Sequence, residues 1–356
     1  MQFENVYKNK KIFITGISGF KGTWLAYWLN STGAKVTGIS FDKKNFKSNL
    51  KKNTFKNKKI NIQNLTKLEK HLKKIQPEII FHLAAQPLVI DSYEDPIETW
   101  KTNVIGTANL LEVCKKLNKI KAIIIVTSDK CYKDNPKLSR YKEIDQLGGH
   151  DPYSSSKAST ELLVESFRLS FFNKINSPKV ATVRAGNVIG GGDWGKNRII
   201  PDIMLSIYEN KDLYIRNLNA IRPWQHVLDC LSGYLLLGQN LILNKNLNYN
   251  SWNFGPSIKS KKSVINLIET LEKKLPKVKY RTKIKSTSMQ ESEYLMLDSS
   301  LAKKKLQWKP ILSFREAINL TNSWYNEFYI HNKLIYDQQL KDYFNKALKR
   351  NAKWIK

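Results

Sequence analysis

Three closely spaced glycines separate the first predicted strand from the first predicted helix. The strand is Lys11–Thr15, and Gly16, Gly19 and Gly22 follow it in the pattern G-x-x-G-x-x-G. Glycines in such a turn let backbone N–H groups approach a pyrophosphate closely, and the N-terminus of the next helix adds a partial positive charge. The turn therefore predicts a dinucleotide-binding unit at the start of the chain.

Apolar patterning through residue 184 alternates between short strands and helices. Such alternation is typical of a parallel sheet with helices on both faces, in which ligands bind beyond the carboxyl ends of the strands. We therefore predict an α/β fold, a Rossmann-type doubly wound parallel sheet with a smaller C-terminal substrate domain. The predicted strands are 11–15, 35–40, 78–83, 121–127 and 180–184, and the predicted helices are 19–30, 65–75, 97–117, 153–172, 201–209 and 262–275.

The regular alternation ends near residue 186, where a run of three glycines, 190–192, marks a loop. We assign residues 1–185 to the dinucleotide-binding domain, and we expect segments around 218–255 to return to it. Residues 186–356 form mainly the substrate domain and end in a basic tail, 332–356, with a helical pattern. No low-complexity linker separates the two domains, so we expect them to pack tightly.

Positive charge is the unusual feature of the composition. The 356 residues include 60 Lys and Arg against 30 Asp and Glu, a formal net charge of +30. Charge of this size is compatible with a nucleic-acid-binding protein or one that lies on an anionic membrane. Only nine of the 60 cations are arginine, the residue suited to bidentate phosphate recognition, and the lysines are scattered. We interpret the excess mainly as surface lysine and expect neither a nucleic-acid nor a membrane partner.

Apolar runs and cysteines indicate the compartment. The longest apolar runs, such as Ala122–Val126, are too short to span a bilayer, and residues 1–10 lack the apolar core of a secretory signal. Cys114, Cys131 and Cys230 are spaced too widely for a disulfide framework or a zinc site. We therefore expect a cytoplasmic protein without a metal centre.

Tyr153 and Lys157 form a Y-x-x-x-K pair at the start of a predicted helix. Residues four apart lie on one helix face. A free phenol has a pKa near ~10, and a nearby ammonium favours the phenolate and lowers that value. We therefore predict that Tyr153 is a general base that Lys157 activates. An amphipathic surface helix with an incidental pair is the alternative.

A second polar group follows the predicted strand 121–127. Ser128, Asp129 and Lys130 place a hydroxyl, a carboxyl and an amine consecutively at the carboxyl edge of the sheet. A simple alcohol oxidation needs only the hydroxyl, to hold the substrate oxygen. The acid and the amine indicate further proton transfers, although a polar loop would also explain either of them alone.

These segments together resemble the extended short-chain dehydrogenase/reductases, an NAD-dependent epimerase/dehydratase family, and within it the CDP-glucose 4,6-dehydratases. The resemblance extends from Thr15 to about Leu312. Ser128-Asp129-Lys130 is informative, because the related dTDP-glucose dehydratases have Thr-Asp-Glu there and the epimerases have no such acid pair. The resembling motifs are 15–22, 82–87, 103–107, 127–132, 153–157, 184–194 and 222–227.

The resemblance implies a sugar-nucleotide 4,6-dehydratase that converts CDP-glucose to CDP-4-keto-6-deoxyglucose with internally recycled NAD. Tyr153 would take the proton of the 4-hydroxyl as C4 is oxidised, and Ser128 would hold the 4-oxygen. Asp129 would protonate the departing 6-hydroxyl. Lys130, at the position of a glutamate base in the dTDP enzymes, would remove the C5 proton. Lys157 would complete the catalytic group.

The resemblance also implies the binding residues. The substrate diphosphate and sugar would be held by Asn187, Arg198 and Arg222. NAD would be held by the glycine turn, by the loops after the strands and by the catalytic helix, namely Gly16, Gly19, Phe20, Gly22, Asn61, Ile62, Ala84, Ala85, Gln86, Asn103, Thr127, Tyr153 and Lys157. The residues alone leave NAD and NADP open, because Asp42 would favour a ribose 2′-hydroxyl whereas Lys43 and Lys44 suit a 2′-phosphate.

Two departures and three alternatives accompany this interpretation. The family usually has Gly-Asp-Ile-Arg-Asp where this chain has residues 60–64, Ile-Asn-Ile-Gln-Asn, and usually has His-Glu where this chain has Met289-Gln290-Glu291. The alternatives are a dehydratase for a UDP- or dTDP-sugar, an epimerase, and a basic nucleic-acid-binding protein without catalysis. In this family, helices corresponding to 97–117 and 153–172 form a four-helix contact, so a homodimer is expected.

Overall fold

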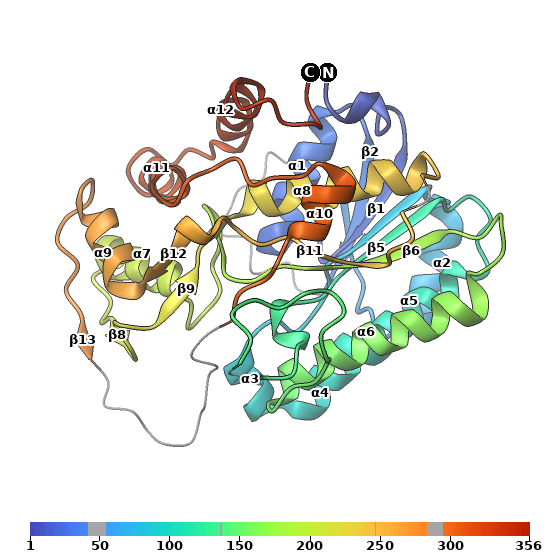
Figure 1. Ribbon diagram of the computed structural model, residues 1–356, viewed down its shortest axis with the longest axis horizontal. Coiled ribbons are helices and arrows are strands. Elements are labelled where there is room, and N and C mark those ends of the chain that lie inside the picture. The colour runs from blue at the N-terminus through green and yellow to red at the C-terminus, as the bar shows by residue number, and fades with distance from the viewer. Residues whose placement is uncertain (42–54, 136, 246, 283–294) are drawn as a thin grey trace.

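A seven-stranded, fully parallel sheet forms the centre of the computed structural model, which describes residues 1–41, 55–135, 137–245, 247–282 and 295–356 (Figure 1). The strand order is β11-β6-β5-β4-β1-β2-β3, so the order reverses between β1 and β4. This arrangement confirms the predicted doubly wound fold and places the switch point beside the glycine turn. The strands are β1 (Lys11–Thr15), β2 (Lys35–Ser40), β3 (Lys56–Lys59), β4 (Ile79–His82), β5 (Ala122–Val126), β6 (Lys179–Arg184) and β11 (Ser251–Asn253).

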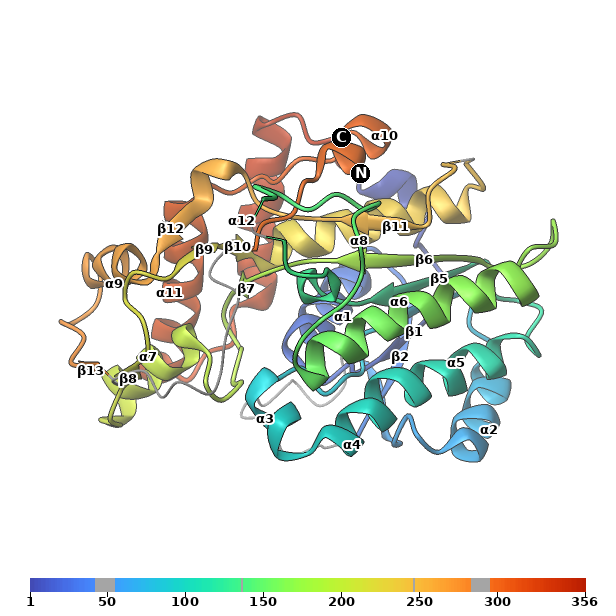
Figure 2. The ribbon, with the colours of Figure 1, turned by 60° about the horizontal axis from the view of Figure 1, so that its bottom comes forward.

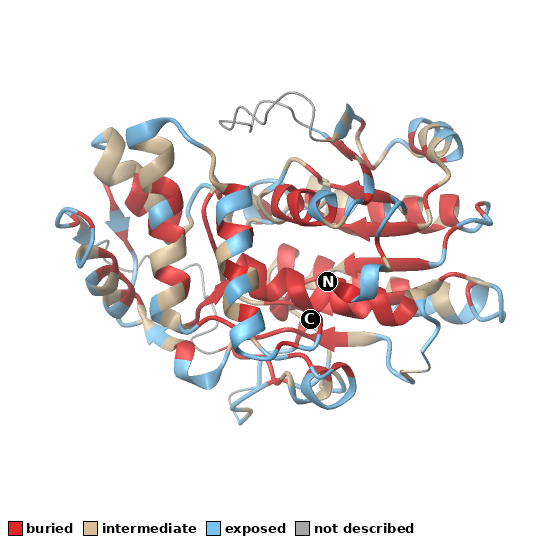
Figure 3. Cartoon of the chain, turned by 90° about the horizontal axis from the view of Figure 1, so that it is seen from above, coloured by how far each residue is buried: buried red, intermediate tan, exposed pale blue. Residues whose placement is uncertain are grey.

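Helices cover both faces of this sheet. The central strands β1, β4, β5 and β6 are buried on both faces, as expected of parallel strands inside a sheet. In β1, for example, Phe13 joins a core with α2 (Leu65–Ile75), α5 (Gly106–Cys114) and α6 (Pro152–Phe171), whereas Ile12 and Ile14 join a larger core. That larger core includes α1 (Phe20–Ser31) and α8 (Val227–Ile242). Figure 3 shows the middle strands of the central sheet as buried, and α8 is buried over nearly its whole length.

Several elements differ from the predictions. The buried helix α8 and the helices Ser300–Leu306 and Phe314–His331 were not predicted. The predicted helix 97–117 is a helical run in three parts, α4 (Pro96–Trp100), a π-helical segment (Lys101–Ile105) and α5. The polar strand β3 was not predicted, because three of its four residues are lysines and it lies at the edge of the sheet. A short helix, α3 (Val89–Glu94), precedes α4.

A second lobe lies beyond the carboxyl edge of the sheet (Figure 2). It contains α7 (Ile199–Glu209), α9 (Val264–Glu272) and three small two-stranded pairs. The pair β7 (Val188–Ile189) with β10 (Gln225–His226) adjoins the main sheet domain, since the next residue begins α8. The other pairs are β9 (Ile221–Pro223) with β12 (Lys261–Ser263) and β8 (Tyr214–Ile215) with β13 (Arg281–Thr282).

The C-terminal segment returns to the first helix of the chain. It consists of α10 (Ser300–Leu306), α11 (Phe314–His331) and α12 (Tyr336–Lys349). The Tyr336 ring stacks on Tyr27 of α1 at 4.4 Å, and the Trp354 ring stacks on Phe3 at 5.4 Å. The predicted basic helical tail therefore packs against α1 and the N-terminal segment through aromatic side chains. The two termini lie side by side (Figure 1).

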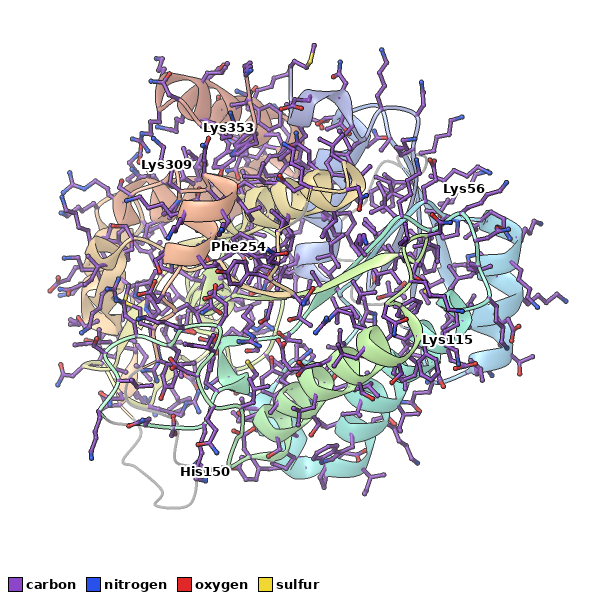
Figure 4. All side chains as sticks on the ribbon, turned by 45° about the vertical axis from the view of Figure 1, so that its right-hand side comes forward. Lys56, Lys115, His150, Phe254, Lys309 and Lys353 are labelled. Carbon is purple, nitrogen blue, oxygen red and sulfur yellow. The ribbon has the colours of Figure 1, made fainter. Side chains whose placement is uncertain are left out.

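The excess lysine lies mainly at the surface. Figure 4 shows the Lys56 side chain reaching outward from the ribbon, whereas Phe254 lies among packed side chains of the core. No helix in the described ranges combines the length and the apolar character needed to cross a membrane. Nor do the described residues gather three or more His, Cys, Asp or Glu side chains in a group that could hold a metal ion.

Candidate active site

The glycine turn closes tightly between β1 and α1. Gly16 has a φ of +68°, a left-handed conformation that favours glycine, and its N–H donates to the Ile39 carbonyl at 2.8 Å. A Cβ on Gly22 would lie 2.1 Å from the Gly16 oxygen, so no larger side chain fits there. The turn therefore requires glycine at both positions.

The N-terminus of α1 suits an anion. Gly19 is the residue before the helix, no side chain caps the helix there, and its first turn contains no acidic residue. The first N–H groups of a helix have no partners within it, and they carry the positive end of the helix dipole. The cradle thus fits the pyrophosphate of a dinucleotide, the group that Gly16, Gly19, Phe20 and Gly22 are predicted to hold.

A directional chain of hydrogen bonds joins this turn to the next strand. Thr15 Oγ1 accepts the N–H groups of Leu83 and Ala84, so its proton is free to be donated to His82 Nδ1 at 2.6 Å. His82 Nε2 then donates to Thr107 Oγ1 at 2.9 Å, because that hydroxyl donates to the Asn103 carbonyl. Burial lowers the pKa of His82 to about 3, so the imidazole takes part in these hydrogen bonds in its neutral form.

The other predicted cofactor residues lie around the same carboxyl edge. A Cβ on Gly16 would lie 2.8 Å from the Ala84 nitrogen, so the glycine turn contacts the loop of Ala84 and Ala85. Asn61 Oδ1 accepts the Gln63 N–H at 2.9 Å, and Ile62 packs under Gly106.

Asn103 and Gln86 are engaged within the protein. Asn103 Oδ1 accepts the Gln86 N–H at 2.8 Å, and its Nδ2 donates to the Gln86 carbonyl and to Ser156 Oγ. The Gln86 side chain bonds Leu88 and Thr99. In this arrangement both side chains hold the loop after β4.

Ser128, Asp129 and Lys130 lie in one tight turn at the end of β5. Ser128 Oγ donates to Asp129 Oδ1 at 3.0 Å and accepts the Lys130 N–H at 3.2 Å. Burial raises the pKa of Asp129, although the Lys130 charge and the Ser128 hydrogen bond oppose the rise. A Cβ on Gly186 would lie 2.7 Å from Asp129 Oδ2, so this glycine makes the room that the carboxyl occupies.

Tyr153 and Lys157 share the buried face of α6, as predicted. The Lys157 ammonium lies 6.0 Å from the centre of the Tyr153 ring. Burial raises the pKa of Tyr153 to about 12, and interaction with the Ser128 side chain opposes the rise. The predicted lowering of the phenol pKa is therefore wrong for the ligand-free protein, because loss of solvent is the largest cause and raises the pKa. Burial and Lys21 lower the pKa of Lys157 itself to about 8.

The predicted substrate residues occupy different surroundings. Arg198 Nη1 donates to both carboxylate oxygens of Asp193 at 3.0 Å, and its charge also acts to lower the Tyr153 pKa. Arg198 thus faces the catalytic group. Arg222 lies on β9, where its Nη1 donates to the adjacent Ile221 carbonyl. Asn187 is half-buried, and its carbonyl accepts the Gln225 N–H.

Some predicted positions lie outside the described residues. These are Asp42, Lys43 and Lys44, which bear on NAD against NADP, and the motif Met289–Glu291.

Sequence reasoning missed several groups that the fold brings to this site. Glu161 lies one helical turn beyond Lys157, and Arg184 of β6 bonds it bidentately. Lys21, in the first turn of α1, acts electrostatically on both Lys157 and Asp129. For Glu161 a signal existed, because positions 153, 157 and 161 follow one face of a helix.

The fold and the site define a Rossmann-type enzyme of the extended short-chain dehydrogenase/reductase class. The family model of GDP-mannose 4,6 dehydratase matches residues 13–321, and the chain belongs to this family. It is 41% identical over 330 residues to the CDP-glucose 4,6-dehydratase of Salmonella typhimurium, covering 90% of this chain and 92% of that protein. This similarity confirms the resemblance inferred from the motifs.

Further relatives have other substrates in their names. A dTDP-D-glucose 4,6-dehydratase of Dictyostelium discoideum is 33% identical over 69% of this chain and 58% of its own length. Among solved structures, the UDP-glucose 4-epimerase of Thermotoga maritima matches with a TM-score of 0.76 at 24% identity, covering 89% of this chain and 98% of that one. The dTDP-glucose 4,6-dehydratase of Bacillus anthracis, in complex with NAD, matches with a TM-score of 0.71 at 24% identity, covering 89% and 96%. These two likenesses establish the fold.

Proposed function

We propose that this protein is a sugar-nucleotide 4,6-dehydratase that converts CDP-glucose to CDP-4-keto-6-deoxyglucose with NAD as a recycled cofactor. The substrate follows from the Salmonella relative, whose name specifies CDP-glucose. NAD follows from the pyrophosphate cradle at α1 and from the cofactor in the Bacillus anthracis complex.

The buried Asp129 carboxyl is the observation that carries this proposal. Burial raises its pKa, and its charge is felt by the Tyr153 phenol, so the two groups serve one pocket. A carboxyl whose pKa is raised holds its proton to a higher pH than an exposed one, which suits it to protonate a departing hydroxyl. A 4-epimerase has no leaving group and therefore no use for such an acid.

The roles of the residues follow from their placement. Bound NAD⁺ would supply a hydride acceptor for C4 and, once reduced, a donor for C6. Ser128 holds the 4-oxygen, and Tyr153 takes the 4-hydroxyl proton with the cationic Lys157 on the same helix face. The resulting 4-keto group acidifies C5–H, Lys130 removes that proton, and Asp129 protonates the 6-oxygen as water leaves. A proton returns to C5 once C6 has received the hydride. Asn187, Arg198 and Arg222 hold the sugar and diphosphate.

A substrate panel tests the proposal. The purified protein is incubated with NAD⁺ and with CDP-, UDP- or dTDP-glucose, and the alkaline absorbance of a 4-keto product is followed. We expect product from CDP-glucose at the highest kcat/KM. Preference for another nucleotide would reassign the substrate, and a 4-epimer without water loss would identify an epimerase. Salt-sensitive binding of DNA or RNA without any turnover would identify a nucleic-acid-binding protein.

Replacement of Lys130 by Ala should lower the rate of dehydration by about 10²–10⁴-fold, the range for a general base. The physical reason is that no other amine lies in the turn after β5 to take the C5 proton. Solvent deuterium incorporation at C5 and product formation measure the effect. Exposed Lys133, three residues further on, supplies the matched control Lys133→Ala. Full dehydration by Lys130→Ala, or an unchanged rate for Lys130→Glu, would remove Lys130 from the role of base.

We also propose a homodimer formed by α4, α5 and α6, which lie side by side on one face (Figure 2). Large apolar side chains on α4 and α6 and on the π-helical segment Lys101–Ile105 are exposed to solvent, whereas such groups are normally buried or scattered. They are Ile97, Trp100, Ile105, Leu162, Leu169 and Phe171, and Leu162 is 57% exposed.

Replacement of Leu162 and Leu169 by Glu should convert this dimer into a monomer of 41.3 kDa. Two carboxylates would have to lose their water in an apolar contact, which costs several kcal/mol each. Light scattering after gel filtration measures the mass. Ile258→Glu, at an exposed position on the other lobe, is the control that should remain dimeric. A wild-type mass of one chain would refute the dimer.

The remaining assignments are proposals of the same kind. We assign the enzyme to the cytoplasm, which agrees with three free, buried cysteines. We also retain the domain division, with residues 1–185 and about 218–255 binding NAD and mainly 186–356 binding the sugar nucleotide.

A further inference from the structure

A fully buried ion pair lies directly behind the candidate active site. Arg184 Nε and Nη2 donate to the two carboxylate oxygens of Glu161 at 2.9 and 2.8 Å, and both side chains are less than 5% exposed (3% and 4%). The hydroxyls of Thr127 and Thr182 donate to the same two oxygens. Each oxygen of Glu161 therefore accepts two hydrogen bonds, which satisfies a charge that would otherwise be costly to bury.

This pair holds both ends of the catalytic turn. Thr127, bonded to Glu161, is the residue immediately before Ser128. Tyr132, two residues after Lys130, accepts a hydrogen bond from Arg184 Nη1 at 2.7 Å, and the guanidinium lies 4.9 Å from its ring. Tyr132 in turn donates to Asn253 Oδ1 of β11 at 2.8 Å. Hydrogen bonds from Thr127 and to Tyr132 therefore fix the two ends of the turn 128–130 to the same ion pair.

The same carboxylate also belongs to the helix that bears the base. Glu161 lies four residues after Lys157 and eight after Tyr153, so all three face the sheet from α6. The groups that face the Lys157 ammonium are Lys21 of α1, His82 of β4, Cys131 of the turn, and Tyr153 and Glu161 of α6. Of these, Glu161 is the carboxylate, and it opposes the lowering of the Lys157 pKa that burial and Lys21 produce.

We propose that Glu161 and Arg184 are positioning residues, which lock the Ser128–Lys130 turn against the Tyr153 and Lys157 face of α6 and keep Lys157 cationic. The inference rests on the proposed function, because it assigns these residues to the dehydratase reaction. Neither side chain is exposed to a ligand, so both act through the groups that they hold.

Two variants separate positioning from general stability. Glu161→Gln keeps the shape of the side chain but removes its charge. Its control is Glu78→Gln, which makes the same change in the Lys10–Glu78 ion pair (2.9 Å) at the amino ends of the strands. The double variant Glu161→Leu/Arg184→Met replaces the whole pair with apolar groups, an exchange that often leaves stability intact. Melting temperatures identify which variants are folded.

We expect folded Glu161→Gln and the double variant to lose about 10²-fold in kcat with little change in KM, the scale of a misplaced reacting group. Removing a negative charge that faces an ammonium lowers its pKa. The alkaline limb of the kcat profile should therefore move further below the value of about 8 that Lys157 has in the intact protein. Glu78→Gln should leave kcat and the limb unchanged. A folded double variant with wild-type kcat and an unmoved limb would overturn the proposal.

A second measurement does not depend on the substrate. NAD⁺ binding is titrated through quenching of tryptophan fluorescence, below and above the pKa of Lys157. Binding by Glu161→Gln should weaken at a lower pH than binding by the wild type, because the ammonium is lost earlier. Identical pH dependence in the two proteins would also overturn the proposal. Failure of the wild type to convert any sugar nucleotide would refute the proposed function instead, and this titration would still decide the inference.

Discussion

Tyr153→Phe should lower the rate of sugar-nucleotide dehydration by about 10²–10⁴-fold while leaving substrate and NAD⁺ affinity almost unchanged. The substitution removes only the oxygen that takes the 4-hydroxyl proton. The ring stays in the same buried place on α6, where Tyr153 is 8% exposed. Because C4 oxidation precedes every later step, the reduced cofactor should not form. Stopped-flow absorbance of the reduced cofactor and the yield of 4-keto product measure both effects.

The pH dependence of the same step has a definite sign. The phenol must lose its proton to act as a base, and burial raises its pKa to about 12 in the ligand-free protein. The rate of C4 oxidation should therefore rise with pH on the acid side of the profile, and bound NAD⁺ should bring that limb to lower pH by its positive charge. Tyr214→Phe, at a half-exposed position on β8, is the matched control. A Tyr153→Phe enzyme with the wild-type rate would exclude the phenol as the base.

Asp129→Asn should separate oxidation from dehydration. The amide occupies the same volume, and it leaves Tyr153, Lys157 and the cofactor cradle intact, so C4 oxidation should continue. It has no acidic proton for the departing 6-hydroxyl, so loss of water should slow by about 10²–10⁴-fold. Rapid mixing with CDP-glucose should then show reduced cofactor accumulating, with little 4-keto-6-deoxy product.

This accumulation distinguishes Asp129 from the other groups, because Tyr153→Phe should show neither reduced cofactor nor product. Asp212→Asn makes the same chemical change at an exposed position and should behave as wild type. Normal product formation by Asp129→Asn would show that another acid, or water, protonates the leaving group. Loss of the reduced cofactor signal in this variant would instead show that Asp129 serves the oxidation.

Much of the fold and of the candidate site could be predicted from local patterns. The glycine spacing 16-19-22, the alternating strands and helices, and the four-residue separation of Tyr153 and Lys157 each depend on a few neighbouring residues. Backbone geometry and helical periodicity make such patterns readable without knowledge of the fold. The same motifs indicated the family, because each is a short contiguous segment that can be recognised without knowledge of the fold.

Other features depend on segments that only the folded chain brings together. Arg184 meets Glu161 because β6 pairs with β5, and α6 packs on these strands. A side chain larger than glycine at position 186 would collide with the Asp129 carboxyl, which comes from the end of another strand. The C-terminal tail was predicted only to be basic and helical, and the structure shows that Tyr336 and Trp354 pack it on α1 and the N-terminus.

The sequence by itself determined the class of fold and the family, and it indicated the candidate reacting groups, because these follow from local spacing and residue chemistry. The tertiary structure alone decided the surroundings that shift the pKa values of those groups. Lys157 was expected to lower the Tyr153 pKa, yet burial raises it, and burial likewise raises the pKa of Asp129. The free energy of a buried charge depends on how much water and which opposing charges surround it, and both are set by contacts between distant parts of the chain.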